Sequence, residues 1–237
     1  MRELKSSGGR PILVSLTRLE PPVSWGPLNR AIKNLNSFDA VVFTSESAVE
    51  RFFIQARRIG KKLDLPQSLY AVGPKTAQAL KKRGWRKIHV AVERRAEGLL
   101  RMMRNVRGWR ILIPRAESGR EILPQSLRLR GAIVSVPPVY RAKSNPQGKA
   151  QLKKISKEKV DAALFASGRS VHEFVAALGS SKSHEFFART IAVSIGPVTS
   201  KALKQYGINA IEAQSAQTKA LVVALKKHFT RFNENNR

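Results

Sequence analysis

Cysteine is absent from the 237-residue chain, which excludes disulfide scaffolds, thiolate metal sites and cysteine nucleophiles. Acidic residues are scarce: 16 Asp and Glu stand against 44 Lys and Arg, a formal net charge of +28 at pH 7. The longest apolar stretches, such as 132–140, are far shorter than the roughly 18–20 residues that span a bilayer. The residues after Met1 lack the apolar core of a secretory signal. We therefore expect a cytoplasmic protein that does not cross a membrane.

Positive charge is what the sequence has in excess, and it attracts polyanions of three kinds: nucleic acid, an anionic membrane surface, or a small acidic substrate. Nucleic-acid modules usually concentrate their basic residues on one element. Here basic residues run from Arg2 to Arg237 in short clusters only. A solvated basic surface is therefore the simpler interpretation. We do not expect nucleic acid as the main partner, although the charge permits it.

The pattern along the chain predicts an α/β fold. The length suits one large domain or two small ones. Short β-rich runs alternate with helical patterns, which is typical of parallel sheets flanked by helices. The expected strands are 40–43, 70–72, 87–92, 110–113, 133–136, 162–165 and 191–195. The expected helices are 48–58, 75–83, 120–130, 171–178, 198–206 and 219–229. Ligands of such sheets bind beyond the carboxyl ends of the strands, so a site is expected in the turns there.

An internal duplication is the most informative feature of the sequence. The segment 38–45 recurs at 160–167, and the segment 72–81 recurs at 195–204. Both pairs are separated by nearly the same number of residues, and that separation is too long for a solenoid repeat. The duplication predicts two similar α/β lobes.

A weaker repeat concerns the N-terminus. Residues 9–18 echo residues 131–141, but a complete strand–helix unit precedes only the second copy. One lobe is therefore expected to be discontinuous and to lack an N-terminal strand and helix. The Pro-rich segments that follow the two echoing strands are expected to connect the lobes. The predicted organisation is 1–18 and 145–230 for the discontinuous lobe, 25–136 for the continuous lobe, 19–24 and 137–144 for the connectors, and 231–237 for a tail.

Familiar cofactor motifs are missing. Neither a Gly-x-Gly-x-x-Gly fingerprint nor a phosphate-binding loop of the Gly-x4-Gly-Lys-Ser/Thr type occurs, so a nucleotide cofactor has no sequence support. The four histidines lack the spacing of metal ligands, and we expect no metal site. They are His89, His172, His184 and His228.

A Gly-Pro-x-Thr turn follows a predicted strand in both lobes and is the best candidate for binding an anion. Glycine allows close approach, proline presets the first helical turn, and the free N–H groups there attract carboxylates or phosphates. A plain helix N-cap is the alternative, but the occurrence in both lobes favours a function. The same reasoning applies to the turns after 40–43 and 162–165. The candidate binding residues are Thr44, Ser45, Gly73, Thr76, Ser167, Gly168, Gly196, Pro197 and Thr199.

Two arginines and one tyrosine complete the candidates. Arg115 and Arg120 lie between a predicted strand and a helix, where guanidinium groups can grip carboxylates. Pairing with Glu117 or Glu121 is the alternative. Tyr140 follows two prolines of the second connector, and its hydroxyl either faces a cleft or is buried and satisfied. The sequence leaves both alternatives open.

Taken in order, these motifs resemble the uroporphyrinogen-III synthase family over about residues 9–226. The matching segments begin at Phe38, Ala71, Leu112, Val139 and Ile195 and follow the family's order. The resemblance implies two α/β lobes joined by a two-stranded connector. It also implies a lyase without cofactor that closes linear hydroxymethylbilane to uroporphyrinogen III and inverts the last ring. Tyr140 falls on the family's linker tyrosine and would assist the loss of hydroxide.

The resemblance also sets expectations for partners and leaves alternatives open. The implied substrate is a linear tetrapyrrole, the implied supplier is hydroxymethylbilane synthase, and we expect a monomer. Ala166 stands where the first copy has Thr44, which removes one possible hydroxyl. Together with the absent strand–helix unit, this predicts reduced or conditional activity for the chain as given, or a misassigned start. The alternatives are a basic polyanion- or nucleic-acid-binding protein on the same scaffold, and an inactive truncated synthase.

Overall fold

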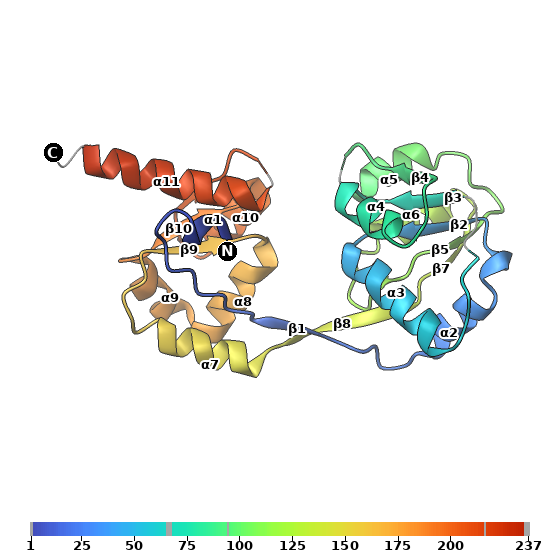
Figure 1. Ribbon diagram of the computed structural model, residues 1–237, viewed down its shortest axis with the longest axis horizontal. Helices are drawn as coiled ribbons and strands as arrows, with labels where there is room; N and C mark the ends of the chain where they lie inside the picture. The colour runs from blue at the N-terminus through green and yellow to red at the C-terminus, as the bar shows by residue number, and fades with distance from the viewer. Residues whose placement is uncertain (1, 65–67, 94, 216, 235–237) are drawn as a thin grey trace. The chain divides into compact units, whose positions relative to one another are not determined.

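The computed structural model describes residues 2–64, 68–93, 95–215 and 217–234 (Figure 1). The chain forms two compact units. Unit 1 comprises Met1–Arg18 and Ser144–Arg237, and unit 2 comprises Leu19–Lys143. Each unit has its own apolar cores. Within the described residues, no helix is both long enough and apolar enough to span a membrane.

Unit 2 is built on a five-stranded parallel sheet in the order β4-β3-β2-β5-β7. Its central strand β2 is completely buried because it has strands on both sides and helices on both faces. The strands are β2 (Ala40–Phe43), β3 (Ser68–Ala71), β4 (Ile88–Val90), β5 (Arg110–Leu112) and β7 (Ile133–Ser135). The helices are α2 (Gly26–Lys33), α3 (Glu46–Arg58), α4 (Pro74–Lys81), α5 (Ala96–Met102) and α6 (Ile122–Leu129), with a 3-10 turn at Leu35–Ser37.

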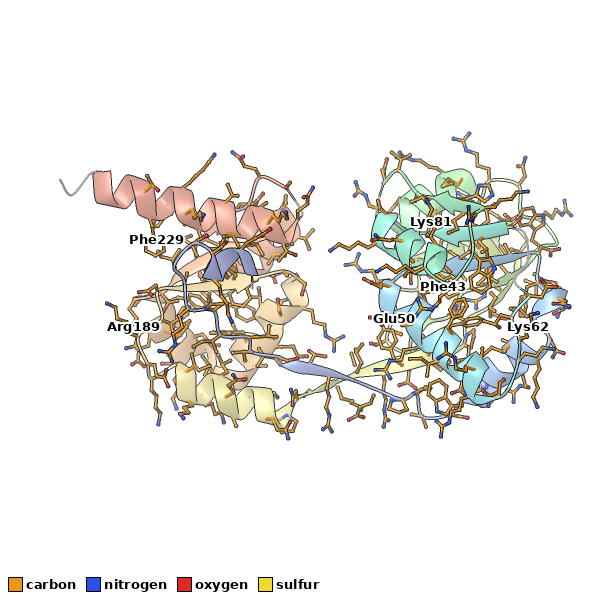
Figure 2. The ribbon with its side chains drawn as sticks, in the orientation of Figure 1. Phe43, Glu50, Lys62, Lys81, Arg189 and Phe229 are labelled. Atoms are coloured by element: carbon orange, nitrogen blue, oxygen red, sulfur yellow. The ribbon has the colours of Figure 1, made fainter. Side chains whose placement is uncertain are left out.

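Helix α3 shows why these segments fold as they do. Its apolar residues Val49, Phe52 and Ala56 recur at helical spacing and are buried against the sheet. Phe52 meets Phe43 of β2 edge-to-face, with ring centroids 5.5 Å apart. Burying one such side chain stabilises the fold by about 2–3 kcal/mol. In Figure 2, Phe43 lies inside unit 2, whereas Lys62 lies at its surface.

Unit 1 has a three-stranded parallel sheet in the order β11-β10-β9. One core packs β9 and β10 against α7, α8, α9 and α10, and a smaller core packs the sheet against α11. The short helix α1 lies beside α11 (Figure 1). The strands are β9 (Ala162–Phe165), β10 (Ile191–Ser194) and β11 (Ala210–Glu212). The helices are α1 (Arg2–Lys5), α7 (Pro146–Ile155), α8 (Gly168–Leu178), α9 (Ser180–Phe187), α10 (Pro197–Lys204) and α11 (Thr218–Glu234).

The two connecting segments lie side by side, as predicted. β1 (Thr17–Glu20) and β8 (Pro138–Ser144) are neighbours in one small sheet. Glu20 and Arg141 form an ion pair of 3.2 Å between these strands. A short strand that the sequence did not predict, β6 (Arg115–Ala116), pairs in parallel with β8 on its other side. The connector is therefore a three-stranded sheet.

The duplication is confirmed in the order of elements. Apart from the additional helix α9 between α8 and β10, the order β9-α8-β10-α10-β11 of unit 1 repeats β2-α3-β3-α4-β4 of unit 2. In both units the helices flank a parallel sheet, as the α/β pattern predicted.

The strand expected within residues 9–18 is wrong for most of its length. Residues 9–16 adopt no strand, and β1 begins only at Thr17. The counterpart β7 is a strand because it hydrogen-bonds to β5, but no described strand of unit 1 occupies the position of β5. Without such a partner, Ile12 and Leu13 remain 46% and 70% exposed. The end of this segment is instead held by Asn145, whose side-chain amide donates to the Ser15 carbonyl at 2.7 Å.

Candidate functional site at the strand carboxyl ends

Parallel register brings the candidate turns of each unit to one edge of its sheet. Phe43 and Ala71 are partners across β2 and β3, so the turns that begin at Thr44 and Val72 are adjacent. The Val72 amide donates to the Phe43 carbonyl at 3.0 Å. In unit 1 the Ile195 amide donates to the Phe165 carbonyl at the same distance. The two candidate turns of each unit therefore lie next to each other.

The two Gly-Pro helix starts keep unused hydrogen-bond donors. Helix α4 begins after Gly73 and α10 begins after Gly196, and neither helix has a side-chain cap. The first N–H groups of a helix have no intrahelical acceptor. The amides of Thr76 and Val198 are therefore free to donate to a ligand, and the helix dipole favours an anion there. Both starts have the donors that the sequence predicted.

The serines of the other two turns are already occupied. Ser45 Oγ accepts from the Ala48 amide at 3.1 Å, and Ser167 Oγ accepts from the Ser170 amide at 3.2 Å. They are N-caps of α3 and α8, which is the structural alternative for these residues. Helix α8 packs against α10 at Gly168, where an added Cβ would lie 3.4 Å from Ala202 Cβ, which is about an ordinary van der Waals contact. These residues hold helix starts in place next to the Gly-Pro turns.

The surroundings of the Gly-Pro turns determine which groups a ligand can reach. Thr76 and Thr199 are only 4% and 3% exposed as whole residues, so their hydroxyls are not displayed at the surface of the turns. A Cβ added to Gly196 would meet no atom within 4 Å, so this turn is open. Lys75 is exposed in the first turn of α4, and the matching position of α10 is the exposed Val198.

Arg115 and Arg120 have different environments. Arg115 is 8% exposed, and its guanidinium pairs with Glu121 and donates to the Arg120 carbonyl. Its Nε is buried and has no hydrogen-bond partner among the described residues. Gly119 makes room for this side chain, because a Cβ at Gly119 would lie 2.8 Å from Arg115 Cδ. Arg120 is exposed and forms no ion pair within the described ranges. Arg120 is therefore the arginine that is available to a ligand.

Tyr140 lies on β8 and is half-buried against the core that contains Val41 and Phe43. Its carbonyl accepts from the Glu117 amide at 2.9 Å, which fixes the backbone of the strand beside β6. Its hydroxyl makes no hydrogen bond to the part of the chain that the structure describes. A phenol in this situation has its proton available for a ligand.

The sequence interpretation overlooked polar residues behind the Gly196 turn. Ser200 lies in the first turn of α10 and hydrogen-bonds to both Ser194 and Glu212. The sequence does contain a sign of them: the repeat aligns Ser194 and Ser200 with alanines of the first copy, so the two copies differ in polarity at these positions. Within the described residues, no group of three or more His, Cys, Asp or Glu side chains is arranged to hold a metal ion.

Comparison with known proteins identifies the family. The sequence profile of uroporphyrinogen-III synthase HemD matches residues 1–223. The chain belongs to the uroporphyrinogen-III synthase family. A uroporphyrinogen-III synthase of Synechococcus elongatus is 31% identical over 235 residues, covering 95% of this chain and 88% of the relative. This result confirms the resemblance carried by the motifs.

Solved structures of uroporphyrinogen-III synthases show the same fold. A mutant synthase of Thermus thermophilus matches with a TM-score of 0.69 at 21% identity, over 98% of this chain and 93% of that one. The Helicobacter pylori enzyme matches with a TM-score of 0.60 at 20% identity, over 89% and 90% of the two chains. The two-lobed α/β architecture predicted from the sequence is therefore confirmed.

Proposed function

We propose that the chain catalyses the reaction of its family, the closure of linear hydroxymethylbilane to uroporphyrinogen III with loss of water. The observation that carries this proposal is the pair of uncapped Gly-Pro helix starts at repeated positions of a strongly basic chain. The substrate bears an acetate and a propionate on every pyrrole. Each free helix start offers such a carboxylate backbone donors and a favourable dipole.

Binding is proposed to rest on backbone amides and a few exposed cations. The amides of Thr76 and Val198 would hold carboxylates, with Gly73, Gly196 and Pro197 shaping the turns. Thr44, Ser45, Ser167, Gly168 and Thr199 would support these turns from inside the units. Arg120 would add a charged contact, and Arg115 would hold its loop through Glu121.

The chemistry requires orientation more than acid–base machinery. When the C–O bond of the hydroxymethyl group breaks, the departing hydroxide takes up a proton and leaves an azafulvene cation. The substituted carbon of the terminal ring must then attack that cation to form a spiro intermediate, which reopens and recloses at the other carbon. Holding the reacting carbons in position makes this closure effectively intramolecular. Tyr140, whose hydroxyl has no partner in the described part of the chain, would supply the proton to the leaving group.

Gly196→Asp tests the proposal that a helix start binds substrate. An aspartate at the N-cap would accept from the first amides of α10 and so occupy the donors meant for the substrate. We expect a KM for hydroxymethylbilane raised about tenfold or more, since the lost contacts are charge-assisted hydrogen bonds. Gly196→Ala is the matched control, because it adds a Cβ at the same positive φ of 159°, and so carries the same backbone strain, without adding an acceptor.

Product analysis separates the outcomes. Wild-type protein should convert bilane to the type III isomer faster than the spontaneous closure to the type I isomer. Gly196→Asp should retain the melting temperature of Gly196→Ala while its KM rises well above that of the control. If wild type forms no type III isomer, the synthase proposal fails. If the two variants share one KM, the role of this helix start fails.

We also propose a cytoplasmic monomer that receives its substrate from hydroxymethylbilane synthase. The proposed lobe boundaries are those of the sequence interpretation, 25–136 for the continuous lobe and 145–230 with 1–18 for the other. Sedimentation velocity of the purified chain tests the oligomeric state, and a single species of about twice the monomer mass would overturn it. Coupled assays with hydroxymethylbilane synthase test the supply of substrate.

A further inference from the structure

A chain of three polar side chains ties the Gly196 turn to the sheet of unit 1. Ser194 is the last residue of β10, Ser200 lies in the first turn of α10, and Glu212 is the last residue of β11. Ser194 Oγ and Ser200 Oγ are 2.6 Å apart, and Ser200 Oγ lies 2.5 Å from Glu212 Oε2. Because a carboxylate only accepts, Ser200 donates its single hydroxyl proton to Glu212. Ser194 must then donate to Ser200, so the relay has one direction.

The position of the relay ends is set by strand register. Ser194 and Glu212 are Cα partners across β10 and β11, which places their side chains at the same level of the sheet. Ser194 is completely buried, whereas Glu212 is exposed. A buried hydroxyl without a partner is costly, so the relay gives Ser194 the acceptor it needs. It thereby links α10 to two strands at once.

In the other unit, apolar residues take the places of the three relay residues. Ala71 and Val90 are the register partners across β3 and β4, in the places of Ser194 and Glu212. Ala77 occupies the place of Ser200, because each lies four residues after the glycine of its turn. Ala71 and Ala77 are buried in an apolar core. Since apolar contacts suffice in unit 2, folding alone does not require the relay of unit 1.

We infer that Glu212, acting through Ser200, is a positioning residue that holds the first turn of α10 in the orientation that binds a substrate carboxylate. This inference rests on the proposed function, since the carboxylate belongs to the bilane. Two features point to this role. Ser200 and Thr199 donate their amides to the Gly196 carbonyl at 3.0 Å, so movement of Ser200 displaces the open glycine turn. Among the described residues, the Ser200 hydroxyl is the hydrogen-bond partner of the Glu212 carboxylate, which makes Glu212 a support of the turn and not a ligand.

Two variants remove hydrogen bonds of the relay, and a third variant keeps them. Glu212→Ala removes the acceptor, and Ser200→Ala removes the middle of the relay. Both variants should raise the KM for hydroxymethylbilane about tenfold, the usual effect of losing a hydrogen bond to a charged group, and change kcat less than twofold. Glu212→Gln keeps an acceptor oxygen and should restore the wild-type KM. Glu158→Ala removes an exposed carboxylate elsewhere in unit 1 and is the matched charge control.

Amide hydrogen exchange supplies a readout that does not depend on activity. Amide exchange at residues 199–201 should be at least tenfold faster in Glu212→Ala than in wild type, and the wild-type rate should return in Glu212→Gln. Equal exchange in wild type and Glu212→Ala would overturn the inference. Faster exchange with an unchanged KM would also overturn it, because the turn would then not position substrate. If wild type makes no type III isomer, the proposed function fails, whereas exchange still shows whether Glu212 holds the turn.

Discussion

At the scale of single residues, Tyr140 carries the sharpest test of the chemistry. Tyr140→Phe keeps the half-buried ring on the core and removes only the hydroxyl. Loss of a proton donor to the leaving group should lower kcat by about a hundredfold, at the lower end for general acid catalysis. The free energy of unfolding should stay within about 0.5 kcal/mol of wild type, because the hydroxyl has no hydrogen-bond partner among the described residues. Single-turnover kinetics with the type III isomer as readout would measure the effect, and an unchanged kcat would remove Tyr140 from the mechanism.

Tyr70 makes a second residue-scale prediction, this time about stability. Burial raises the pKa of Tyr70 above its ordinary value of 10.0. Above pH 10 the unfolded chain therefore loses this proton before the folded one, so stability falls as pH rises. Below pH 10 the tyrosine is neutral in both states and contributes no such dependence. Urea unfolding at pH 8 and at pH 11 should show a smaller alkaline loss in Tyr70→Phe than in wild type. Equal losses in the two proteins would contradict the assignment.

Arg115 shows what sequence cannot decide at this scale. The sequence placed it after a strand and left two readings, a carboxylate grip or pairing with a nearby acid. The structure pairs it with Glu121, next to a glycine that leaves room for its side chain. Arg115 belongs to β6, which pairs with β8. No local sequence pattern predicts this pairing, so the environment of Arg115 could not be predicted either. The sequence did predict the free helix starts, because Gly-Pro fixes a helix start locally.

At the scale of elements, the N-terminal segment depends on one glycine of α7. A Cβ at Gly148 would lie 1.9 Å from the Ser15 carbonyl oxygen, so the segment and the helix touch through their backbones. Gly148→Ala must push the two apart and break the hydrogen bond from Asn145 to Ser15. We expect a loss of about 2–4 kcal/mol in unfolding free energy, although alanine favours a helix intrinsically. Chemical denaturation checks this, with the exposed Gln147→Ala of the same helix as control. A Gly148→Ala variant as stable as that control would show that the segment is not docked on α7.

The elements that sequence predicted and missed differ in their apolar content. The strands at 40–43 and 191–195 are runs of apolar residues, and such runs report burial directly. Helices α2 and α7 were missed because their buried residues are few and are separated by Arg, Lys, Asn and Gln. Their helical state comes from tertiary packing and from a proline in the first turn. β6 is two residues long and exists only through its pairing with β8.

At the scale of the whole molecule, the duplication gives two copies of one scaffold, and different kinds of contact hold the Gly-Pro turn in each copy. Unit 2 surrounds its Gly73 turn with apolar side chains, and unit 1 secures its Gly196 turn with the Ser194–Ser200–Glu212 relay. The sheets also differ, since β2 has two neighbouring strands whereas β9 has one within the described residues. Such differences arise because each copy only has to keep the turn that it presents, and different contacts achieve this equally well.

The charge of the whole chain leads to a final prediction. A net charge of +28 destabilises the compact state through self-repulsion, and the ion pairs of the described residues involve only a few of the basic side chains. Raising sodium chloride from about 0.05 M to about 0.5 M shortens the screening length about threefold and should raise the melting temperature by several degrees. An uncharged osmolyte at equal osmolality is the control for general solvent effects.

The same titration separates the synthase from a nucleic-acid binder. Binding to single-stranded RNA should weaken linearly in a log–log plot against salt, with a slope that counts the phosphates contacted. A steep slope, which corresponds to many contacted phosphates, together with tight RNA binding near about 0.15 M salt would favour the polyanion-binding alternative. Weak RNA binding at that salt concentration, together with a KM for bilane that rises modestly with salt, would show that the charge serves a small acidic substrate.

The melting temperature tests the self-repulsion argument separately. A melting temperature that does not change with salt would contradict it, because repulsion between exposed like charges must weaken when salt screens them.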